Sequence, residues 1–306
     1  MPAEFEGQVA LITGAGDVDG LGFAHARYLA ERGARIVLND YGGGTLGLVE
    51  QGVDSGVAAA AGERIRELGV EVIVNTGDVG DPQTAENMVR EALDAWGRVD
   101  IVVNNAGIAS AQFFPDVDAE EVERHVRVTL LGCLYTARSA WPHFVEQGRG
   151  RIVNTGSPAC FGNEIAAYAS TKAGLFGLTR TAAIFGAPHD IRVNLLLPAA
   201  WSRLTAMLPD SGFKRRLEAD FGADRISPLV GWLVSQRCNV TGETFTAGAG
   251  GFSRVVYAAS EVQSLEGDLE SVGAAVSRAM ADTRWTVFES TQDNMVHLGM
   301  PEDIDR

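Results

Sequence analysis

Tyr168 and Lys172 are the residues of this chain whose types and spacing could do chemistry. They stand four positions apart in the stretch 166–178, AAYASTKAGLFGL, which reads as a helix, so both side chains would project from one face. An isolated tyrosine has a pKa near ~10, and a neighbouring cation favours the phenolate. The pair could therefore exchange a proton with a ligand, although a helix can also carry Tyr and Lys at this spacing by chance.

The size and charge of the chain limit its partners. Its 306 residues, 46% of them hydrophobic, suffice for one large α/β domain with a tail, which we expect, or for two small domains. The formal net charge of -15 argues against nucleic acid and an anionic membrane surface, and it favours a small-molecule partner. The three cysteines are far apart and the five histidines do not cluster, so neither a disulfide framework nor a metal site is predicted.

The N-terminal sequence MPAEFEGQVALITG has no basic region followed by an apolar run. No stretch reaches the roughly 18 uninterrupted apolar residues of a membrane-spanning helix. We therefore expect a cytoplasmic protein.

Short apolar runs alternate with helical patterns along most of the chain. The expected strands are 8–13, 35–40, 70–78, 99–107, 151–157, 191–198 and 243–251. The expected helices are 21–33, 57–68, 81–97, 119–145, 166–185 and 226–236. Because the strands are too apolar for burial on one face only, the pattern predicts an α/β fold with a doubly wound parallel sheet of about seven strands and helices on both faces.

A glycine-rich segment, TGAGDVDGLG, follows the first expected strand. In it Gly14 and Gly20 lie in the loop, and Leu21 and Gly22 open the next helix. Glycines at this place let backbone NH groups and a helix N-terminus approach a pyrophosphate, which predicts a dinucleotide site.

Asp40 adds a second feature, because it ends the second expected strand. A carboxylate there can bind the ribose hydroxyls of an adenosine and would repel a 2'-phosphate, so NAD is predicted rather than NADP. The other reading of Asp40 is the polar first residue of a turn before the glycines at 42–44.

These and further motifs resemble the short-chain dehydrogenase/reductase family over roughly residues 5–250. In the family's order they are TGAG with GLG, Asp78 with Val79, NNAG at 104–107, Ser157, YASTK, and Pro198 after VNLLL. The resemblance implies a Rossmann-type fold. The sequence is most similar to the branch that contains the (3R)-hydroxyacyl-CoA dehydrogenase unit of peroxisomal multifunctional enzyme type 2, through ALDAWGRVDIVVNNAGI, the long GG-containing loop after LND, GN at 162–163, SRLT at 202–205 and GAG at 248–250.

The resemblance implies a role for each site residue. Hydride would pass between a nicotinamide and a carbonyl carbon. Tyr168 would exchange the substrate proton, Ser157 would donate a hydrogen bond to the developing alkoxide, and Lys172 would hold the nicotinamide ribose. Further cofactor contacts would be Asn105, Ala106 and Gly107 at the ribose, Asp78 and Val79 at the adenine, and Pro198 at the nicotinamide. The NNAG residues also fit a tight turn after a buried strand.

Two departures from the family pattern concern the loops of the site. Gly14 and Gly20 enclose five residues instead of three, including Asp17 and Asp19, which we expect to bulge away from a diphosphate or to bond to loop NH groups. Ser157 stands eleven residues before the tyrosine, about two fewer than the branch shows. Thr155 is the alternative to Ser157.

A third departure is Thr129, in VTLLG, which replaces a helix-borne asparagine of many family members. A water bound to the backbone there could still relay protons.

We expect an apolar substrate pocket that suits an acyl chain or a fused-ring ligand. Its candidate residues, each of which could equally be ordinary core, are Phe113, Phe114, Phe161, Trp201, Leu204, Met207 and Leu208. Lys214, Arg215 and Arg216 could meet the phosphates of coenzyme A or form a solvated helix face. Cys160 is expected to be a packing residue.

The sequence thus predicts an NAD-dependent oxidoreductase that interconverts a secondary alcohol and a ketone, on a (3R)-hydroxyacyl-CoA thioester or a steroid-like alcohol. The alternatives are a non-catalytic NAD-binding sensor and a 3-oxoacyl carrier protein reductase, which the acidic charge of both chain and carrier disfavours. Substrate identity and physiological direction stay open. From the resemblance we expect a homodimer or homotetramer formed through 119–145 and 166–185.

We assign residues 1–251 to the dinucleotide-binding and catalytic domain and 252–306 to a C-terminal extension. In the extension, apolar residues near helical spacing predict one amphipathic helix that could pack on another subunit; they are Leu265, Leu269, Val272, Val276 and Met280. The last dozen residues are expected to be disordered.

Overall fold

The computed structural model describes residues 4–43, 54–109, 112–206 and 209–301. The chain forms two compact units, Met1–Arg254 and Val255–Arg306. Among the described residues, no helix is both long enough and apolar enough to cross a membrane.

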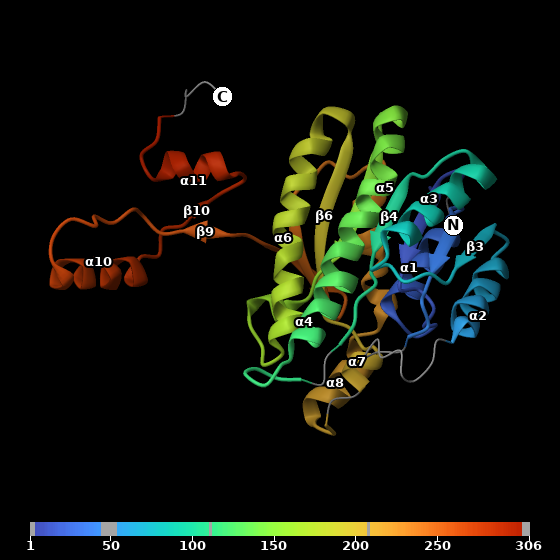
Figure 1. Ribbon diagram of the computed structural model, residues 1–306, viewed down its shortest axis with the longest axis horizontal. Helices are drawn as coiled ribbons and strands as arrows, with labels where there is room; N and C mark the ends of the chain where they lie inside the picture. The colour runs from blue at the N-terminus through green and yellow to red at the C-terminus, as the bar shows by residue number, and fades with distance from the viewer. Residues whose placement is uncertain (1–3, 44–53, 110–111, 207–208, 302–306) are drawn as a thin grey trace. The chain divides into compact units, whose positions relative to one another are not determined.

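The first unit is built on one eight-stranded sheet with the order β3-β2-β1-β4-β5-β6-β7-β8 (Figure 1). The strands are β1 (Val9–Thr13), β2 (Arg35–Asn39), β3 (Val72–Asn75), β4 (Ile101–Asn104), β5 (Gly150–Thr155), β6 (Ile191–Pro198), β7 (Thr244–Gly248) and β8 (Gly251–Val255). Strands β1 to β7 pair in parallel, which confirms the predicted doubly wound sheet.

Strand β8 was not predicted. It follows β7 through the two residues Ala249 and Gly250, whose φ angles of 50° and 80° are those of a tight hairpin turn. The sequence analysis ran one strand through this turn, because AGAGG gives no apolar pattern that would mark a second strand.

Helices cover both faces of the sheet (Figure 1). The described helices of the first unit are α1 (Leu21–Ala30), α2 (Ser55–Arg66), α3 (Pro82–Trp96), α4 (Ala119–His125), α5 (Gly132–Gln147), α6 (Ala166–Gly186), α7 (Arg203–Ala206), α8 (Gly212–Asp220) and α9 (Ser227–Val234). Helix α3 begins and ends where its sequence dictates: the Asp81 side chain accepts a hydrogen bond from the Gln83 NH, and Gly97 adopts φ 71° at the C-terminus.

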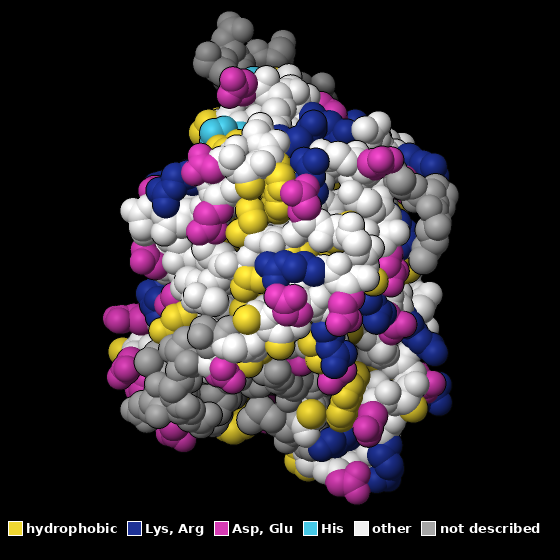
Figure 2. Space-filling model, turned by 90° about the vertical axis from the view of Figure 1, so that its right-hand side faces the viewer, with side chains coloured by type: hydrophobic (Ala, Val, Ile, Leu, Met, Phe, Trp, Pro, Cys, Tyr) yellow, Lys and Arg dark blue, Asp and Glu magenta, His cyan; other side chains and the backbone are white. Residues whose placement is uncertain are grey.

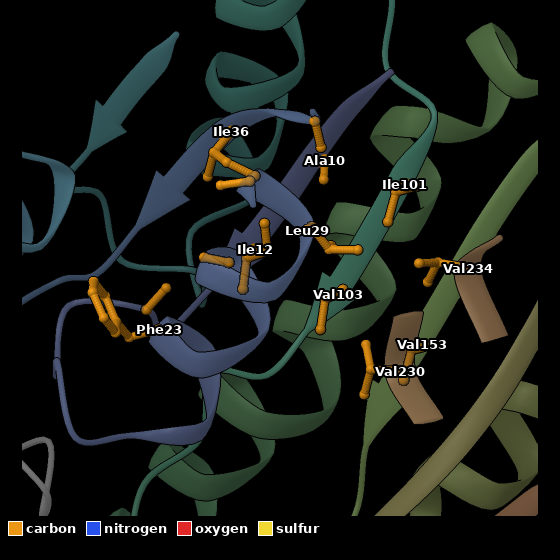
Figure 3. Packing of buried hydrophobic residues seen from close by; sticks show 14 of the residues in the cluster. Ala10, Ile12, Phe23, Leu29, Ile36, Ile101, Val103, Val153, Val230 and Val234 are labelled. Carbon is orange, nitrogen blue, oxygen red and sulfur yellow. The ribbon is translucent and has the colours of Figure 1, made fainter. Parts of the chain in front are cut away.

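Two hydrophobic clusters account for the burial of the sheet. On one face, β-strand residues such as Ile12 and Val103 meet Leu29 of α1 and Val230 of α9 (Figure 3). On the other face, α3, α5 and α6 pack on the sheet around side chains such as Phe144. Burial from both sides explains why the strands are apolar at nearly every position.

The segment predicted as one helix over 119–145 contains a π-helix. Between α4 and α5, residues Val126–Leu131 bond with the wider i→i+5 spacing. Pro142 lies inside α5. No residue type in the sequence VRVTLL is typical of a π-helix, so the π-helix could not be predicted from the sequence pattern.

The strand order places a crevice at the carboxyl ends of β1 and β4. Strand β1 pairs with β2 on one side and with β4 on the other, so the chain leaves these two neighbouring strands in opposite directions. In open α/β sheets, ligands bind at such a switch point.

The second unit, described by itself, is small. Strands β9 (Ala258–Ala259) and β10 (Thr286–Val287) pair antiparallel, and the unit has the helices α10 (Leu269–Ala281) and α11 (Thr291–His297). Helix α10 includes most of the predicted amphipathic helix, but Leu265 precedes it. The strand pair and α11 were not predicted. Of the last dozen residues, those expected to be disordered, 295–297 belong to α11, and 302–306 lie outside the described residues.

Candidate active site

A cleft of about 1020 Å³ lies at the carboxyl ends of the strands and receives the loops that follow β1 to β6. It brings together all the predicted site residues except one. Those that line it are Gly14, Gly20, Leu21, Asp40, Asp78, Val79, Asn105, Ala106, Gly107, Ser157, Tyr168, Lys172 and Pro198. The exception is Gly22, which lies behind the wall.

The glycines of the first loop are required by close contacts. A Cβ on Gly22 would stand 2.3 Å from the Gly14 carbonyl oxygen, and a Cβ on Gly14, whose φ is 64°, would stand 2.7 Å from the Ala106 Cα. No side chain caps α1 at Gly20. The NH groups of the first turn of α1 are therefore available to an anion in the cleft.

The two extra residues of this loop fold into a turn. The Asp19 NH donates to Asp17 Oδ1 over 3.2 Å, and the Gly20 NH donates to the Asp17 carbonyl over 2.9 Å. The Asp17 side chain thus accepts a hydrogen bond from a loop NH group. This was one of the two arrangements expected for Asp17 and Asp19. Asp17 nevertheless lines the cleft, while Asp19 is exposed.

The Asp40 carboxylate joins two loops. Its Oδ2 accepts a hydrogen bond from the Gly16 NH at 2.8 Å, and its Oδ1 accepts one from the Gly42 NH at 2.9 Å. Asp40 is half-buried and borders the cleft. It therefore fixes the glycine-rich loop as well as presenting a negative charge beside it. The long loop that follows lies outside the described residues over 44–53.

Asn105 ties the ends of β1 and β4 together. Its Nδ2 donates to the carbonyls of Thr13 (3.1 Å) and Gly14 (2.9 Å), and its backbone NH donates to the Thr13 hydroxyl. The Ala106 NH donates to the same hydroxyl. The tight-turn reading and the cofactor reading of this segment are compatible, because the side chain is used by the scaffold while the backbone lines the cleft.

Lys172 is 4% exposed and its ammonium group is held beside Tyr168. The Nζ donates to the Thr155 carbonyl at 2.7 Å and lies 5.8 Å from the Tyr168 ring centroid. A Cβ on Gly107 would be 3.1 Å from this Nζ. The chain has only two lysines, Lys172 and Lys214, among its 25 Lys and Arg residues. An arginine-rich chain thus keeps a compact ammonium at this buried position.

Ser157 and Thr155 both line the cleft, but they differ in role. Ser157 is half-buried, and its Oγ accepts a hydrogen bond from the Ala159 NH at 3.1 Å, which caps the short 3-10 helix Pro158–Phe161. Thr155 belongs to β5 and is 4% exposed. The more accessible hydroxyl is that of Ser157, which favours it over Thr155 as the donor to a substrate oxygen.

Arg127 was missed by the sequence analysis. It lies on the π-helix, lines the cleft, and its Nη1 donates to Asp78 Oδ2 over 2.5 Å. The Gly80 NH donates to the other oxygen, Asp78 Oδ1. The sequence separation of 49 residues between the partners gave no signal for this pair.

Glu121 and His125 were also missed. Both are buried on α4, and the His125 ring stands against the Tyr168 ring. Burial lowers the pKa of His125 below its ordinary 6.5, and the nearby Glu121 carboxylate opposes that effect. The sequence shows Glu121 and His125 four residues apart, which is a helical spacing. It does not show toward which part of the molecule their side chains point.

The predicted substrate residues whose side chains the structure describes do not form the wall of the cleft. Phe113, Phe114 and Phe161 are exposed by 51%, 72% and 66%, and neither they nor Trp201 line it. The Leu204 side chain, Met207 and Leu208 lie outside the described residues. The apolar lining comes instead from Ile108, Ile165, Phe213 and Leu217. The spacing of these aromatic residues along the chain could not predict which of their side chains point into the cleft.

The basic residues of α8 are engaged locally. Lys214 Nζ donates to the Ala206 carbonyl at 2.6 Å, Arg215 pairs with Asp210 and Arg216 with Asp220. These contacts favour the solvated-face reading.

On the face shown in Figure 2, Lys and Arg side chains alternate with Asp and Glu, so no continuous basic stripe crosses that face. Burial raises the pKa of the Cys160 thiol, as for a packing residue. Among the described residues, no group of His, Cys, Asp and Glu could hold a metal ion.

Comparison with known proteins decides the family. The family model described as short chain dehydrogenase matches residues 8–212. The chain belongs to the short-chain dehydrogenase family. It is 38% identical over 251 residues to peroxisomal multifunctional enzyme type 2 of Mus musculus, a match that covers 81% of this chain and 32% of that protein. The chain therefore spans about a third of the length of this relative.

Solved structures of the short-chain dehydrogenase family agree with the fold. A short chain dehydrogenase from Mycobacterium avium matches with a TM-score of 0.77 and 29% identity, covering 92% of this chain and 97% of that one.

Related crystal structures contain either nicotinamide dinucleotide. Carveol dehydrogenase from Mycobacterium avium in complex with NAD has a TM-score of 0.69, 27% identity and coverage of 81% and 98% of the two chains. A short chain dehydrogenase from Burkholderia cenocepacia in complex with NADP has a TM-score of 0.68, 28% identity and the same coverage. This protein is accordingly a short-chain dehydrogenase oxidoreductase of a family that binds nicotinamide cofactors.

Proposed function

We propose that this protein is an NAD-dependent dehydrogenase that interconverts a secondary alcohol and a ketone with Ser157, Tyr168 and Lys172. The observation that carries the proposal is the buried Lys172 ammonium beside Tyr168, in the same cleft as the uncapped N-terminus of α1. A proton-exchanging pair and an anion site in one cleft are the two parts that such a reaction needs.

The residues of the cleft fit a dinucleotide. The uncapped N-terminus of α1 suits its diphosphate, and the absence of a Cβ on Gly107 leaves room for a ribose beside the Lys172 ammonium. Asp78 and Val79 would border the adenine and Pro198 the nicotinamide. The nicotinamide supplies the acceptor or donor of hydride when it is bound.

In the proposed reaction the protein moves the proton and stabilises charge on the substrate oxygen. Tyr168 takes the proton from the alcohol during oxidation and returns it during reduction. Lys172 places its positive charge beside Tyr168, and the Thr155 carbonyl fixes it there. Ser157 donates its hydroxyl proton in a hydrogen bond to the alkoxide that develops on the substrate.

We assign NAD, rather than NADP, as the cofactor. Asp40 and Asp17 both line the cleft next to the glycine-rich loop, and either carboxylate would repel a 2'-phosphate. In steady-state kinetics, Asp40→Ala should lower the ratio of kcat/KM for NAD to that for NADP by roughly 10-fold or more, since about 1.4 kcal/mol of repulsion gives that factor. An unchanged ratio would remove the electrostatic argument.

The substrate class we propose is a (3R)-hydroxyacyl-CoA thioester. The support is the similarity to peroxisomal multifunctional enzyme type 2 and the apolar lining by Ile165, Phe213 and Leu217. A steroid-like alcohol is the second candidate, because the same lining suits a fused-ring ligand. The triple change Lys214→Ala, Arg215→Ala and Arg216→Ala tests the role of α8, and unaltered turnover of the thioester would exclude these cations as phosphate ligands.

The decisive experiment is NADH formation by the purified protein with NAD or NADP across (3R)-hydroxyacyl-CoA thioesters and hydroxysteroids. Tyr168→Phe, which keeps the ring and removes the hydroxyl, is the matched control. Turnover with NAD that disappears in Tyr168→Phe supports the proposal. Turnover that survives in Tyr168→Phe contradicts the role of this residue.

The two alternatives have less support. A non-catalytic NAD sensor would not need Tyr168 and Lys172 in a common cleft, yet the longer glycine loop is compatible with it. NAD binding without turnover of any alcohol tested would favour it. A 3-oxoacyl carrier protein reductase would have to bind an acidic carrier with a chain whose net charge is -15.

Self-association is part of the proposal. The helices expected to form the contact expose apolar side chains: Leu134 and Val145 on α5, and Ile184 and Phe185 on α6. In the C-terminal unit, Ala275 is the one fully buried hydrophobic residue among those described, while Leu269 is 93% exposed. We propose that 252–306 packs on a second copy of the chain. Light scattering of the full chain and of a form ending at residue 254 measures both contributions.

The cytoplasmic location stays a prediction. The names of the curated relatives include peroxisomal proteins.

A further inference from the structure

A second pair of side chains four residues apart lies next to Tyr168 and Lys172. Glu121 and His125 belong to α4, which packs against α6, the helix of Tyr168. They are 5% and 0% exposed. Glu121 Oε1 stands 3.3 Å from His125 Nε2, and its other oxygen accepts a hydrogen bond from Arg124. The reaction described above gives this pair no part.

His125 contacts Tyr168 through the edge-to-face packing of two rings. The ring centroids are 6.2 Å apart and the ring planes cross at 83°, an arrangement that aromatic pairs prefer. Tyr168 itself is half-buried, with part of its side chain open to the cleft. A ring packed against one side of Tyr168 limits the rotation that would swing its hydroxyl away from the substrate.

A polar pair is a costly way to fill this space. Burying a carboxylate and an imidazole carries a desolvation penalty that apolar side chains of similar volume would avoid. The Ala109 carbonyl is close enough to act on the His125 pKa, yet neither ring nitrogen of His125 has a hydrogen bond of good geometry. Buried polar groups of this kind call for an explanation beyond packing.

The backbone changes its winding directly after His125. Helix α4 ends at this residue, and the π-helix Val126–Leu131 begins at the next. A π-turn alters the direction of the side chains on either side of it, and such turns occur frequently at functional sites. His125, whose ring packs on Tyr168, is thus the last residue of α4 before this change of winding.

We propose that His125, whose ring lies beside the Glu121 carboxylate, is a positioning residue that keeps the Tyr168 ring in the orientation required for proton exchange. This inference rests on the proposed function for the role of Tyr168. The charged and titratable groups shown to face His125 are Glu121 and Arg124 from α4, and Tyr168 from α6. Burial lowers the His125 pKa below its ordinary value, which favours the neutral ring, and we infer that the ring acts through its shape and contact.

The test compares three variants in steady-state kinetics and NADH binding. His125→Ala removes the ring and should lower kcat by roughly 10- to 100-fold while the dissociation constant for NADH changes by less than about threefold, since a displacement of about 1 Å at a reacting group can cost that much. His125→Phe restores an aromatic edge and should recover kcat to within about threefold of the unaltered protein. Glu121→Gln removes the charge beside the imidazole, and its kcat should lie between those of His125→Ala and His125→Phe.

A matched control is available in His25→Ala. His25 is also fully buried, but it lies on α1 and bonds to Ser227 of α9. The control should lose stability without the loss in kcat per folded molecule. The proposal is overturned if His125→Ala lowers kcat no more than His25→Ala does, or if His125→Phe is as impaired as His125→Ala, since the imidazole would then have a chemical role.

A measurement without substrate separates this inference from the proposed function. In protein labelled with ¹³C at its five tyrosines, the signal missing from Tyr168→Phe identifies Tyr168. That signal should shift or broaden in His125→Ala and return in His125→Phe. A Tyr168 signal unchanged in His125→Ala overturns the inference, even if no alcohol is ever turned over. Absence of turnover in the unaltered protein counts against the proposed function alone.

Discussion

The two walls of the cleft are held together in different ways. On the cofactor side, bonds join segments far apart in the sequence: Asn105 donates to the carbonyls of residues 13 and 14, and Asp40 accepts from the NH of Gly16. On the α7–α8 side, the described side-chain bonds stay within a few residues, as between Lys214 and Ala206 or between Thr205 and the Ser202 carbonyl. The backbone bond from the Trp201 NH to the Phe221 carbonyl joins the two ends of this same segment. The first wall is cross-linked to the sheet, while the second is a local excursion.

This difference indicates which bonds of the cleft the fold requires and which segments can be exchanged. Bonds between strand ends fix the distance between β1 and β4, so a change there disturbs the whole crevice. Bonds within one segment can be exchanged together with that segment. Loops placed on a rigid scaffold in this way can carry different specificities on one reaction centre.

The largest expected effect lies at the junction of the two walls. Lys172→Met removes the ammonium that neighbours Tyr168, and it should lower kcat/KM by roughly 100-fold or more, the scale of a lost proton-transfer contribution. Lys214→Met changes the other lysine of the chain. With an alcohol that carries no coenzyme A, it should remain within about twofold of the unaltered protein, since surface changes away from special features have small effects. Equal losses in both variants would contradict the comparison.

One glycine behind each wall gives the next largest contrast, which is in stability. In Gly22→Ala the new methyl group would meet the Gly14 carbonyl at 2.3 Å, and this overpacking should cost about 1–3 kcal/mol of unfolding free energy. Gly212→Ala, at the start of α8, meets no atom within 4 Å and should be neutral or slightly stabilising. Thermal unfolding of both variants measures the difference, and an unchanged Tm for Gly22→Ala would contradict the close approach of α1 to the loop.

Two asparagine substitutions compare a long-range with a local hydrogen bond, and the expected changes in stability are smaller. Asn105→Ala leaves the Thr13 and Gly14 carbonyls without their side-chain donor and should cost about 1–2 kcal/mol in denaturant unfolding. Asn163→Ala loses only a bond to the Ile165 NH two residues away and should cost less than about 0.5 kcal/mol. Similar costs for the two would mean that long-range and local bonds contribute alike.

The cross-linked wall is also the part that the sequence predicted best. Gly14, Gly20, Asp40 and the NNAG segment follow strands with strong apolar patterns, and each strand end fixes where the next loop meets the cleft. Parallel pairing then brings these loops to one edge of the sheet, whatever their separation in the chain. The doubly wound sheet itself followed from the same alternation of strands and helices.

The substrate wall and the π-helix could not be predicted in the same way. Phe113, Phe114 and Phe161 are aromatic residues in loops, where no periodicity sets the direction of a side chain, and all three are exposed. The contact of His125 with Tyr168 depends on how α4 packs against α6 and on a change of winding after His125. Interactions of this kind arise from tertiary packing and leave no local pattern.

The scarcity of lysine gives the cleft a built-in reporter. Of the two side-chain amines, the half-exposed Lys214 would meet an amine-directed reagent readily, while Lys172 is 4% exposed and bonded to the Thr155 carbonyl. Mass spectrometry of a chain with so few reactive side-chain amines resolves each of them. The rate at which Lys172 is labelled therefore reports how often the cleft opens around Tyr168. The labelling rate of Lys214 in the same sample is the internal reference.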